Sequence, residues 1–184
     1  HAMDEEGAVI TEKDKDDLAF GLTNGVTHVA LSFVASATDI FDLKKRMERE
    51  GRVVPIIAKI ERREAVENIE SICDVSDGIM IARGDLGKNI PFEELPFIEK
   101  DIIALCVKKE KFVIVATEMM LSMTEVDHPT RAEVTDVAAA VSLGAQAVML
   151  SEETSVGKHP AETVRAMRKI LSFAEKERDS GVVL

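Results

Sequence analysis

Short apolar runs alternate with amphipathic segments along nearly the whole chain. The apolar runs lie at residues 26–34, 53–60, 77–84, 112–117 and 145–151. Apolar residues that recur every three or four positions, as in amphipathic helices, occupy residues 11–25, 36–52, 63–76, 91–111, 130–144 and 160–180. Continuously apolar strands that alternate with helices are typical of a parallel sheet covered by helices. We therefore predict an α/β fold of five parallel βα repeats, forming one domain over residues 11–184.

Composition narrows the possible partners and the compartment. The 184 residues, 46% of them hydrophobic, are enough for one compact core, and the net charge of −11 opposes binding to nucleic acid or to an anionic membrane. No apolar run approaches the ~20 residues of a membrane span. Cys73 and Cys106 fit neither a zinc pattern nor a disulfide framework, so we expect buried free thiols in a cytoplasmic protein. The start "HAM" is interpreted as a tag remnant, and residues 1–10 as an N-terminal tail.

Polar residues follow each predicted strand. In parallel α/β folds, functional groups gather at the carboxyl ends of the strands. The residues at these positions are Ser32, Lys59, Glu61, Arg83, Asp85, Thr117, Glu118, Ser151, Glu152 and Glu153. An apolar body with a polar tip, repeated five times, points to a site at this end of the sheet.

The stretch "AKIE" at residues 58–61 places Lys59 and Glu61 on one face of a strand, because strand side chains alternate. One interpretation is that the two side chains simply pair with each other. The other is that Lys59 faces a phosphoryl or carboxylate group, next to Glu61 as a metal ligand.

In the stretch "ARGDLG" at residues 82–87, Gly84 and Gly87 flank Asp85. Glycine lets the backbone approach a ligand closely and leaves amides available to an anion. Asp85 is a hard oxygen ligand, suited to Mg²⁺ together with Glu61. The alternative is a tight strand-to-helix turn that Asp85 caps.

From about Thr11 to Lys169 the chain resembles the second half of the pyruvate kinase catalytic barrel. The stretches that carry the resemblance are "TEKDKDDL", "SFV", "AKIE", "VSDGIMIARGDLG", "VATEMM", "PTRAEVTDVA" and "VMLSEET", in the family's order and at its spacing. The resemblance implies a partial (β/α)8 TIM barrel that contains strands four to eight. It also implies phosphoryl transfer from phosphoenolpyruvate to ADP, which gives pyruvate and ATP.

The resemblance also implies roles for single residues. Mg²⁺ or Mn²⁺ would bind Glu61 and Asp85, and Lys59 would stabilise the phosphoryl group during transfer. The K⁺ site of the family is expected to depend on residues from the first three strands, which precede this part of the barrel.

Substrate contacts are implied at three strand ends. The amides around Arg83, Gly84 and Asp85 would hold the substrate carboxylate at a helix N-terminus. Thr117 would lie beside the enolate, and Ser151 would belong to the hydroxyl network that delivers its proton.

Some positions depart from the family pattern. Glu118 replaces a usual Gln and Glu152 a usual Gly, while Lys88 and Asn89 replace acidic or apolar residues. Two added carboxylates at the mouth of the barrel, where the strands end, would repel an anionic substrate, unless they point away or Lys88 neutralises them.

The family's first three strands, lid domain and C-terminal domain are expected to be absent from these 184 residues. Five strands leave two sheet edges open, so we expect self-association or a chain that supplies the other half of the barrel. The helix "PTRAEVTDVA" would lie at a subunit contact, as in the family, although Arg131 and Glu133 also fit a simple helix-start ion pair.

Three functions remain open from the sequence. The first is a phosphotransferase part that is inactive on its own. The second is a magnesium-dependent aldolase or lyase that acts on a pyruvate enolate without ADP. The third is a non-catalytic regulatory or interaction module.

Overall fold

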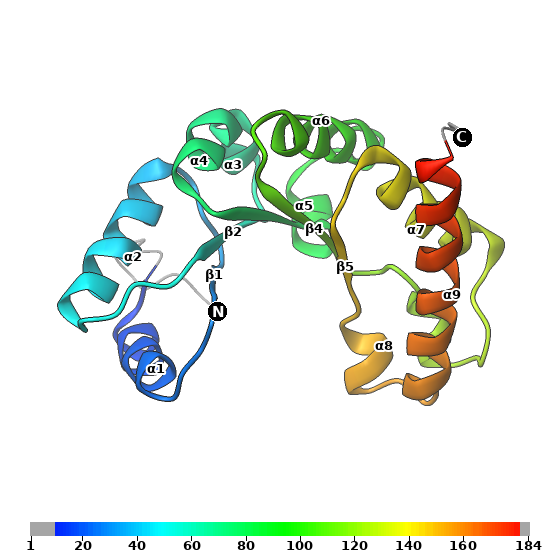
Figure 1. The fold of residues 1–184 in the computed structure, drawn as a ribbon, viewed down its shortest axis with the longest axis horizontal. Helices are drawn as coiled ribbons and strands as arrows, with labels where there is room; N and C mark the ends of the chain where they lie inside the picture. The colour runs from blue at the N-terminus through cyan, green and yellow to red at the C-terminus, as the bar shows by residue number, and fades with distance from the viewer. Residues whose placement is uncertain (1–9, 181–184) are drawn as a thin grey trace.

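The computed structural model describes residues 10–180, and it contains one sheet of five parallel strands. The strands are β1 (Val29–Leu31), β2 (Ile56–Ile60), β3 (Gly78–Ala82), β4 (Phe112–Ala116) and β5 (Ala147–Met149), and they lie in chain order. The predicted α/β fold of five βα repeats is confirmed. Figure 1 shows the sheet as a curved arch whose two ends do not meet.

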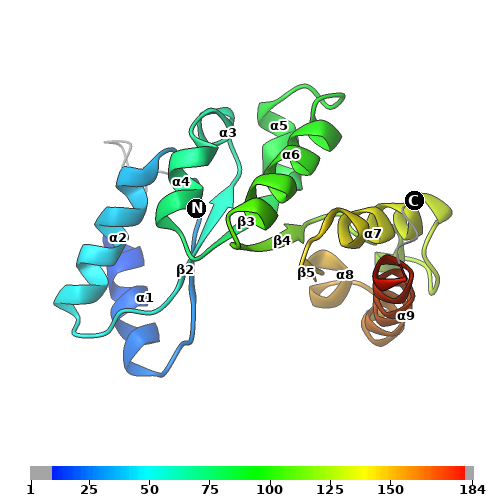
Figure 2. The same ribbon diagram turned by 45° about the horizontal axis from the view of Figure 1, so that its top comes forward.

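The long helices form a layer around the outside of this arch (Figure 2), where α2 contacts α4, α4 contacts α6, α6 contacts α7 and α7 contacts α9. The helices are α1 (Glu12–Thr23), α2 (Ala37–Arg49), α3 (Arg63–Glu67), α4 (Ile69–Val75), α5 (Arg83–Asn89), α6 (Leu95–Lys108), α7 (Arg131–Leu143), α8 (Glu152–Ser155) and α9 (Pro160–Asp179), with a 3-10 turn, η1 (Leu121–Thr124). Compared with the prediction, the helix over 63–76 divides at Asn68, and three short elements, α5, η1 and α8, occupy predicted strand ends or loops.

Local sequence accounts for several helix ends. Thr11 and Thr130 each form a capping box, with Asp14 and Glu133 three residues later. α7 ends at Gly144, whose φ of +109° favours glycine. A side chain at this position would also collide with Val107, since an added Cβ would lie 2.8 Å from its methyl carbon.

Alternation along β2 separates the two faces of the sheet. Ile56, Ala58 and Ile60 belong to the main core beneath the helices. Ile57 faces the concave side, in a small cluster with Met80 and Ala116. Lys59 follows Ile57 by two positions, so it lies on the concave side as predicted.

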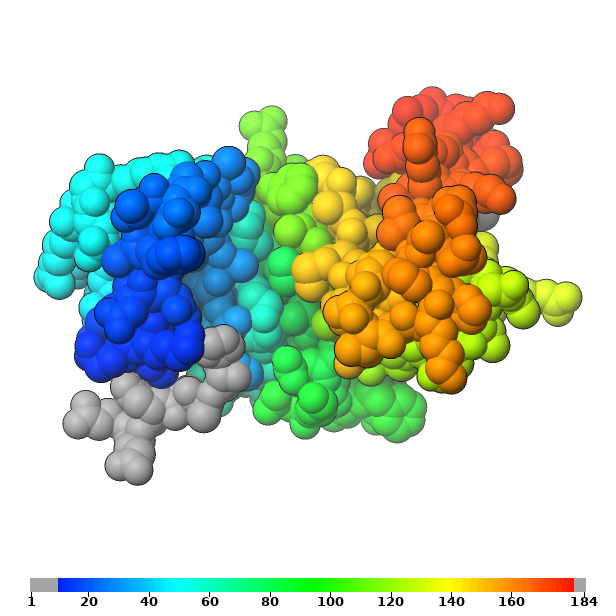
Figure 3. Space-filling model, turned by 90° about the horizontal axis from the view of Figure 1, so that it is seen from below, coloured from blue at the N-terminus to red at the C-terminus, as the bar shows by residue number. Residues whose placement is uncertain are grey.

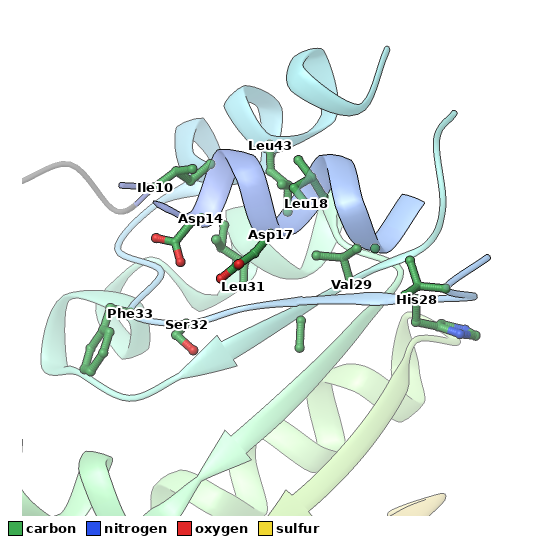
Figure 4. A pocket seen from close by; sticks show the side chains of 13 residues that line it. Ile10, Asp14, Asp17, Leu18, His28, Val29, Leu31, Ser32, Phe33 and Leu43 are labelled. Atoms are coloured by element: carbon green, nitrogen blue, oxygen red, sulfur yellow. The ribbon is translucent and has the colours of Figure 1, made fainter. Parts of the chain in front are cut away.

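Within residues 10–180, β1 and β5 each pair with one neighbour only, which leaves two edges. The N-terminal and C-terminal helices lie at opposite ends of the molecule (Figure 3). Beside β1 is a hollow of about 300 Å³ between α1 and the strand, lined mostly by apolar side chains such as Leu18, Val29 and Leu31, together with polar ones such as Asp17 and His28 (Figure 4). Ile10, in the predicted tail, is buried in the core, and the rest of that tail lies outside the described residues.

Within the described range, no helix is both long and apolar enough to cross a membrane. Cys73 and Cys106 are free and buried, as predicted. Burial raises the pKa of the Cys106 thiol to about 12, so it carries little thiolate at neutral pH.

Candidate functional site

Unusual backbone geometry gathers at the carboxyl ends of the strands. Phe33 follows β1 with a φ of +56°, and Thr117 and Glu118 follow β4 with φ of +70° and +54°. A β-branched residue such as Thr117 rarely adopts this left-handed region, and holding it there costs ~1–3 kcal/mol. Strain of this kind clusters at functional sites, and here it lies where the sequence predicted one.

At the end of β2, Lys59 and Glu61 form an ion pair, which we call the mouth pair. Lys59 Nζ lies 2.6 Å from Glu61 Oε1 and donates to the Ser32 hydroxyl at 3.0 Å. The other carboxylate oxygen, Oε2, accepts from the Phe33 amide at 2.6 Å. Glu61 is 1% exposed and Lys59 23%, so the carboxylate is buried while the ammonium still reaches solvent. The direct pairing considered from the sequence is therefore present.

Asp85 lies in the first turn of α5 and is half-exposed, with Lys88 Nζ 3.0 Å from its carboxylate. Asn89 connects this turn to β2, because its side-chain amide donates to the backbone carbonyl of Glu61 at 3.1 Å and to that of Asp85 at 2.9 Å. The two predicted metal ligands are thus on neighbouring, tied segments. Within the described residues, no group of three or more acidic, His or Cys side chains forms a metal cluster.

A short hydrogen bond joins Gly84 to Thr117. The Gly84 amide donates to Thr117 Oγ1 at 2.6 Å, and that hydroxyl donates to the Ala116 carbonyl at 2.6 Å. A Cβ on Gly84 would lie 3.3 Å from the same hydroxyl oxygen. A larger residue at this position would therefore press on the Thr117 side chain, and the hydroxyl of Thr117 has a fixed orientation.

The guanidinium of Arg83 does not join the mouth pair. It contacts Glu99 of α6 at 3.3 Å and Asp136 of α7 through two parallel contacts of 2.8 and 2.7 Å. It also donates to the backbone carbonyls of Thr117, at 3.1 Å, and Glu118, at 3.3 Å. We call Arg83, Glu99 and Asp136 the Arg83 cluster. The backbone of Arg83 therefore lies at the start of α5, while its guanidinium contacts residues of other elements.

The charged groups of the Arg83 cluster shift one another's pKa values. Burial lowers the pKa of Arg83, but the hydrogen bond and charge of Asp136, and then Glu99, outweigh it, so the pKa is raised. Burial raises the pKa of Glu99, and the charge of Arg83 offsets this rise only in part. Sequence inspection missed Glu99 and Asp136, because both are ordinary acidic residues of amphipathic helices.

The two acidic departures from the family pattern are both exposed. Lys88 lies within electrostatic reach of them, since its pKa is raised first by Asp85 and then by Glu118 and Glu152. The next residue, Glu153, is fully buried and accepts from the backbone amides of Ser151 at 2.7 Å and Met120 at 3.0 Å. The sequence did not distinguish Glu152 from Glu153.

Glu133 fixes the loop before α7. Its carboxylate accepts from the Ser122 amide at 2.7 Å, the Ser122 hydroxyl at 2.6 Å and the Thr130 amide at 2.7 Å. Burial raises its pKa, but these hydrogen bonds outweigh burial and leave the pKa lowered. Arg131 and Glu133 form no ion pair in the described part of the chain, so the capping role of Glu133 is the observed one.

Parallel βα repeats with polar strand ends on the concave side define a domain of the βα-barrel class. A family model for the pyruvate kinase barrel domain matches residues 4–164. The chain belongs to the pyruvate kinase family.

Individual relatives agree with this assignment. Pyruvate kinase from Mycobacterium intracellulare is 51% identical over 94% of this chain, and that from Thermotoga maritima is 46% identical over 91%. A crystal structure of a pyruvate kinase from Cryptosporidium parvum superimposes with a TM-score of 0.90 at 40% identity, over 92% of this chain and 36% of the other. The chain spans 37% and 36% of the lengths of the two bacterial relatives.

Proposed function

We propose that this chain supplies part of a site that transfers a phosphoryl group from phosphoenolpyruvate to ADP. The observation that carries the proposal is the mouth pair, a partly exposed cation held beside a buried carboxylate at the concave strand ends. Phosphoryl transfer depends mainly on positioned charge, and a lysine held by two neighbours provides it. Lys59 is fixed by Ser32 and Glu61, so its ammonium stabilises charge on the phosphoryl oxygens without having to be ordered first.

The carboxylates of Glu61 and Asp85 fit a magnesium or manganese ion in chemistry and in number. Mg²⁺ is commonly held by one or two carboxylates, with waters and substrate oxygens completing its shell. When bound, the ion neutralises charge on the substrate oxygens. Each carboxylate now contacts a lysine, Lys59 or Lys88, so each is already placed to face a cation.

The start of α5 binds the substrate carboxylate in this proposal. Amides in the first turn of a helix lack intrahelical acceptors and favour an anion. In this proposal Thr117 lies next to the enolate. The hydrogen bond from the Gly84 amide to Thr117 Oγ1 supports this, because it holds the Thr117 side chain against the same turn. Ser151 contributes its hydroxyl to proton delivery, from a segment that its amide anchors on Glu153.

The 184-residue chain alone is an incomplete catalyst in this proposal. The open edges at β1 and β5 and the apolar hollow beside β1 support association with a second copy or with a chain that completes the barrel. ADP and phosphoenolpyruvate are then bound only in the assembled barrel. The outward face of α7 is a second candidate for subunit contact.

Binding of Mn²⁺, followed by electron paramagnetic resonance, tests the metal site. We expect the variant Glu61→Gln/Asp85→Asn to bind Mn²⁺ about tenfold more weakly than the wild type or worse. The matched control is Glu48→Gln/Asp101→Asn, which removes the same charge from exposed positions on α2 and α6. Equal affinity for wild type and site variant would contradict the metal assignment.

A coupled assay for pyruvate formation tests the reaction. We expect no turnover from the chain alone, and turnover once the remaining barrel strands are supplied as a separate polypeptide. Turnover by the chain alone would refute incompleteness. No turnover by a folded assembly, together with intact Mn²⁺ binding, would favour the enolate lyase or the non-catalytic module.

A further inference from the structure

We infer that Arg83 is a positioning residue, whose guanidinium holds the strained Thr117–Glu118 turn so that the Thr117 hydroxyl faces the Gly84 amide. The inference deepens the proposed function, because it concerns the turn assigned to the substrate carboxylate and enolate. It keeps the expectation that the backbone amides around Arg83 hold the substrate carboxylate, and it gives the guanidinium a separate, positioning role.

The hydrogen bonds of the guanidinium carry the first step. Nε and Nη2 of Arg83 donate to the Thr117 carbonyl, at 3.3 and 3.1 Å, and Nη2 donates to the Glu118 carbonyl at 3.3 Å. These carbonyls belong to the two consecutive residues of the left-handed turn. A planar cation that binds both carbonyls stabilises a backbone conformation that non-glycine residues otherwise avoid.

The anchoring of the guanidinium carries the second step. Arg83 is 10% exposed, and Asp136 binds it end-on through Nη1 and Nη2, while Glu99 contacts Nη1. Such a bidentate pair fixes the plane of the guanidinium as well as its position. Lysine has one nitrogen and cannot reproduce this geometry.

The consequence at the site is the third step. Thr117 accepts from the Gly84 amide at 2.6 Å while its own hydroxyl donates to Ala116. Gly84 follows Arg83 in the chain. These two consecutive residues therefore bind both the carbonyls of the turn and the hydroxyl of Thr117. If the turn relaxed toward negative φ, the Thr117 side chain would leave Gly84.

Nuclear magnetic resonance of the ¹⁵N-labelled 184-residue chain tests the inference without any assay of activity. In Arg83→Lys we expect the Gly84 amide proton to move upfield and to exchange with deuterium about tenfold faster, as loss of one hydrogen bond predicts. The φ-dependent coupling constant of Thr117 should change with it. Thr117→Val removes the acceptor directly and calibrates the full loss of this bond.

The matched control is Arg52→Lys. Arg52 also donates to two backbone carbonyls, those of Leu22 at 2.6 Å and Val26 at 2.8 Å, but beside β1 and far along the chain from Gly84. A merely structural role for Arg83 predicts that both lysine variants lower stability and that neither moves the Gly84 amide. That result would overturn the inference.

A second variant decides the question if Arg83→Lys does not fold. Asp136→Asn keeps the guanidinium and weakens its anchor, and Asp136 is 37% exposed. We expect the Gly84 amide to shift in the same direction by a smaller amount, and an unchanged amide would again overturn the inference. Binding of phosphoenolpyruvate by the assembled barrel, in the presence of Mn²⁺, separates the two proposals. A lost Gly84 hydrogen bond with unchanged affinity would refute the substrate role of this turn but not the positioning by Arg83.

Discussion

The mouth pair and the Arg83 cluster are both ionic groups at strand ends, but their cations differ in exposure and in the number of partners that they contact. In the mouth pair, one cation meets one buried carboxylate and still reaches solvent. In the Arg83 cluster, one cation meets two carboxylates and two backbone carbonyls, nearly out of water. The buried cation of Arg83 already has all its partners within the chain, whereas the partly exposed cation of Lys59 can still meet a ligand.

The difference separates two roles for a cation at the strand ends. "KIE" provides a group that can change partners when a substrate arrives, while the arginine of "ARGDLG" fixes the backbone beside it. Breaking each group should therefore have different consequences for stability.

The largest expected effect is that of Arg83→Met. Removal of the cation leaves two carboxylates near each other with the burial of Glu99 uncompensated, and breaking a buried ion pair in this way costs ~3–5 kcal/mol. Urea denaturation followed by circular dichroism measures the free energy of unfolding. A loss below that of the mouth-pair variant described next would refute the comparison.

Lys59→Met should have a smaller effect. Glu61 keeps its hydrogen bond from Phe33, and the site opens to water on the side of the lysine, so the expected loss is ~1–3 kcal/mol. The same urea titration applies. Lys45→Met is a control, because its ion pair with Asp42 lies on the exposed face of α2 and should contribute little.

Glu118→Gly should stabilise the chain by ~0.5–1 kcal/mol, because glycine adopts the observed positive φ without steric cost. Glu118→Ala removes the same charge but keeps Cβ, so it should give no such gain. Glu110→Gly, also exposed and at φ +54°, should give a similar gain away from the mouth. Thermal unfolding that shows equal stability for the Gly and Ala variants at 118 would contradict the role of strain.

The smallest expected effect concerns pH. The pKa of Glu99 is raised in the folded chain, so this group binds a proton more readily when folded. Its contribution to stability therefore falls as pH rises from its ordinary value through the raised one, and Glu99→Gln should remove that decline. The measurement is the free energy of unfolding between about pH 4 and pH 8, a range that begins near the ordinary pKa of a glutamate and extends above it.

Glu133→Gln is the opposite case and serves as the control. The lowered pKa of Glu133 means that its stabilisation is present above the ordinary carboxyl value and is lost as pH falls through the lowered one. The two variants should change the pH dependence of stability in opposite directions, and for Glu133→Gln the measurement extends below the ordinary carboxyl value, where the change falls. Identical pH profiles for wild type and Glu99→Gln would contradict the role assigned to burial.

Much of the fold was determined by sequence over short distances. Apolar runs and helical periodicity defined the βα order, and the Thr11 and Thr130 capping boxes and Gly144 defined helix ends, because each depends on residues within about four positions. Lys59 and Glu61 were placed together on one face for the same reason, since strand side chains alternate.

Only the tertiary structure decided where the remaining charges point. Arg83 meets Asp136 across 53 positions, and Glu153 meets Met120 across 33, so no local pattern distinguishes them from exposed neighbours such as Glu152. Likewise, the left-handed turn at Thr117 opposes the local preference of a β-branched residue. Such strain persists only where surrounding contacts outweigh it, and here those contacts come from α5, α6 and α7, which the folded sheet brings to one strand end.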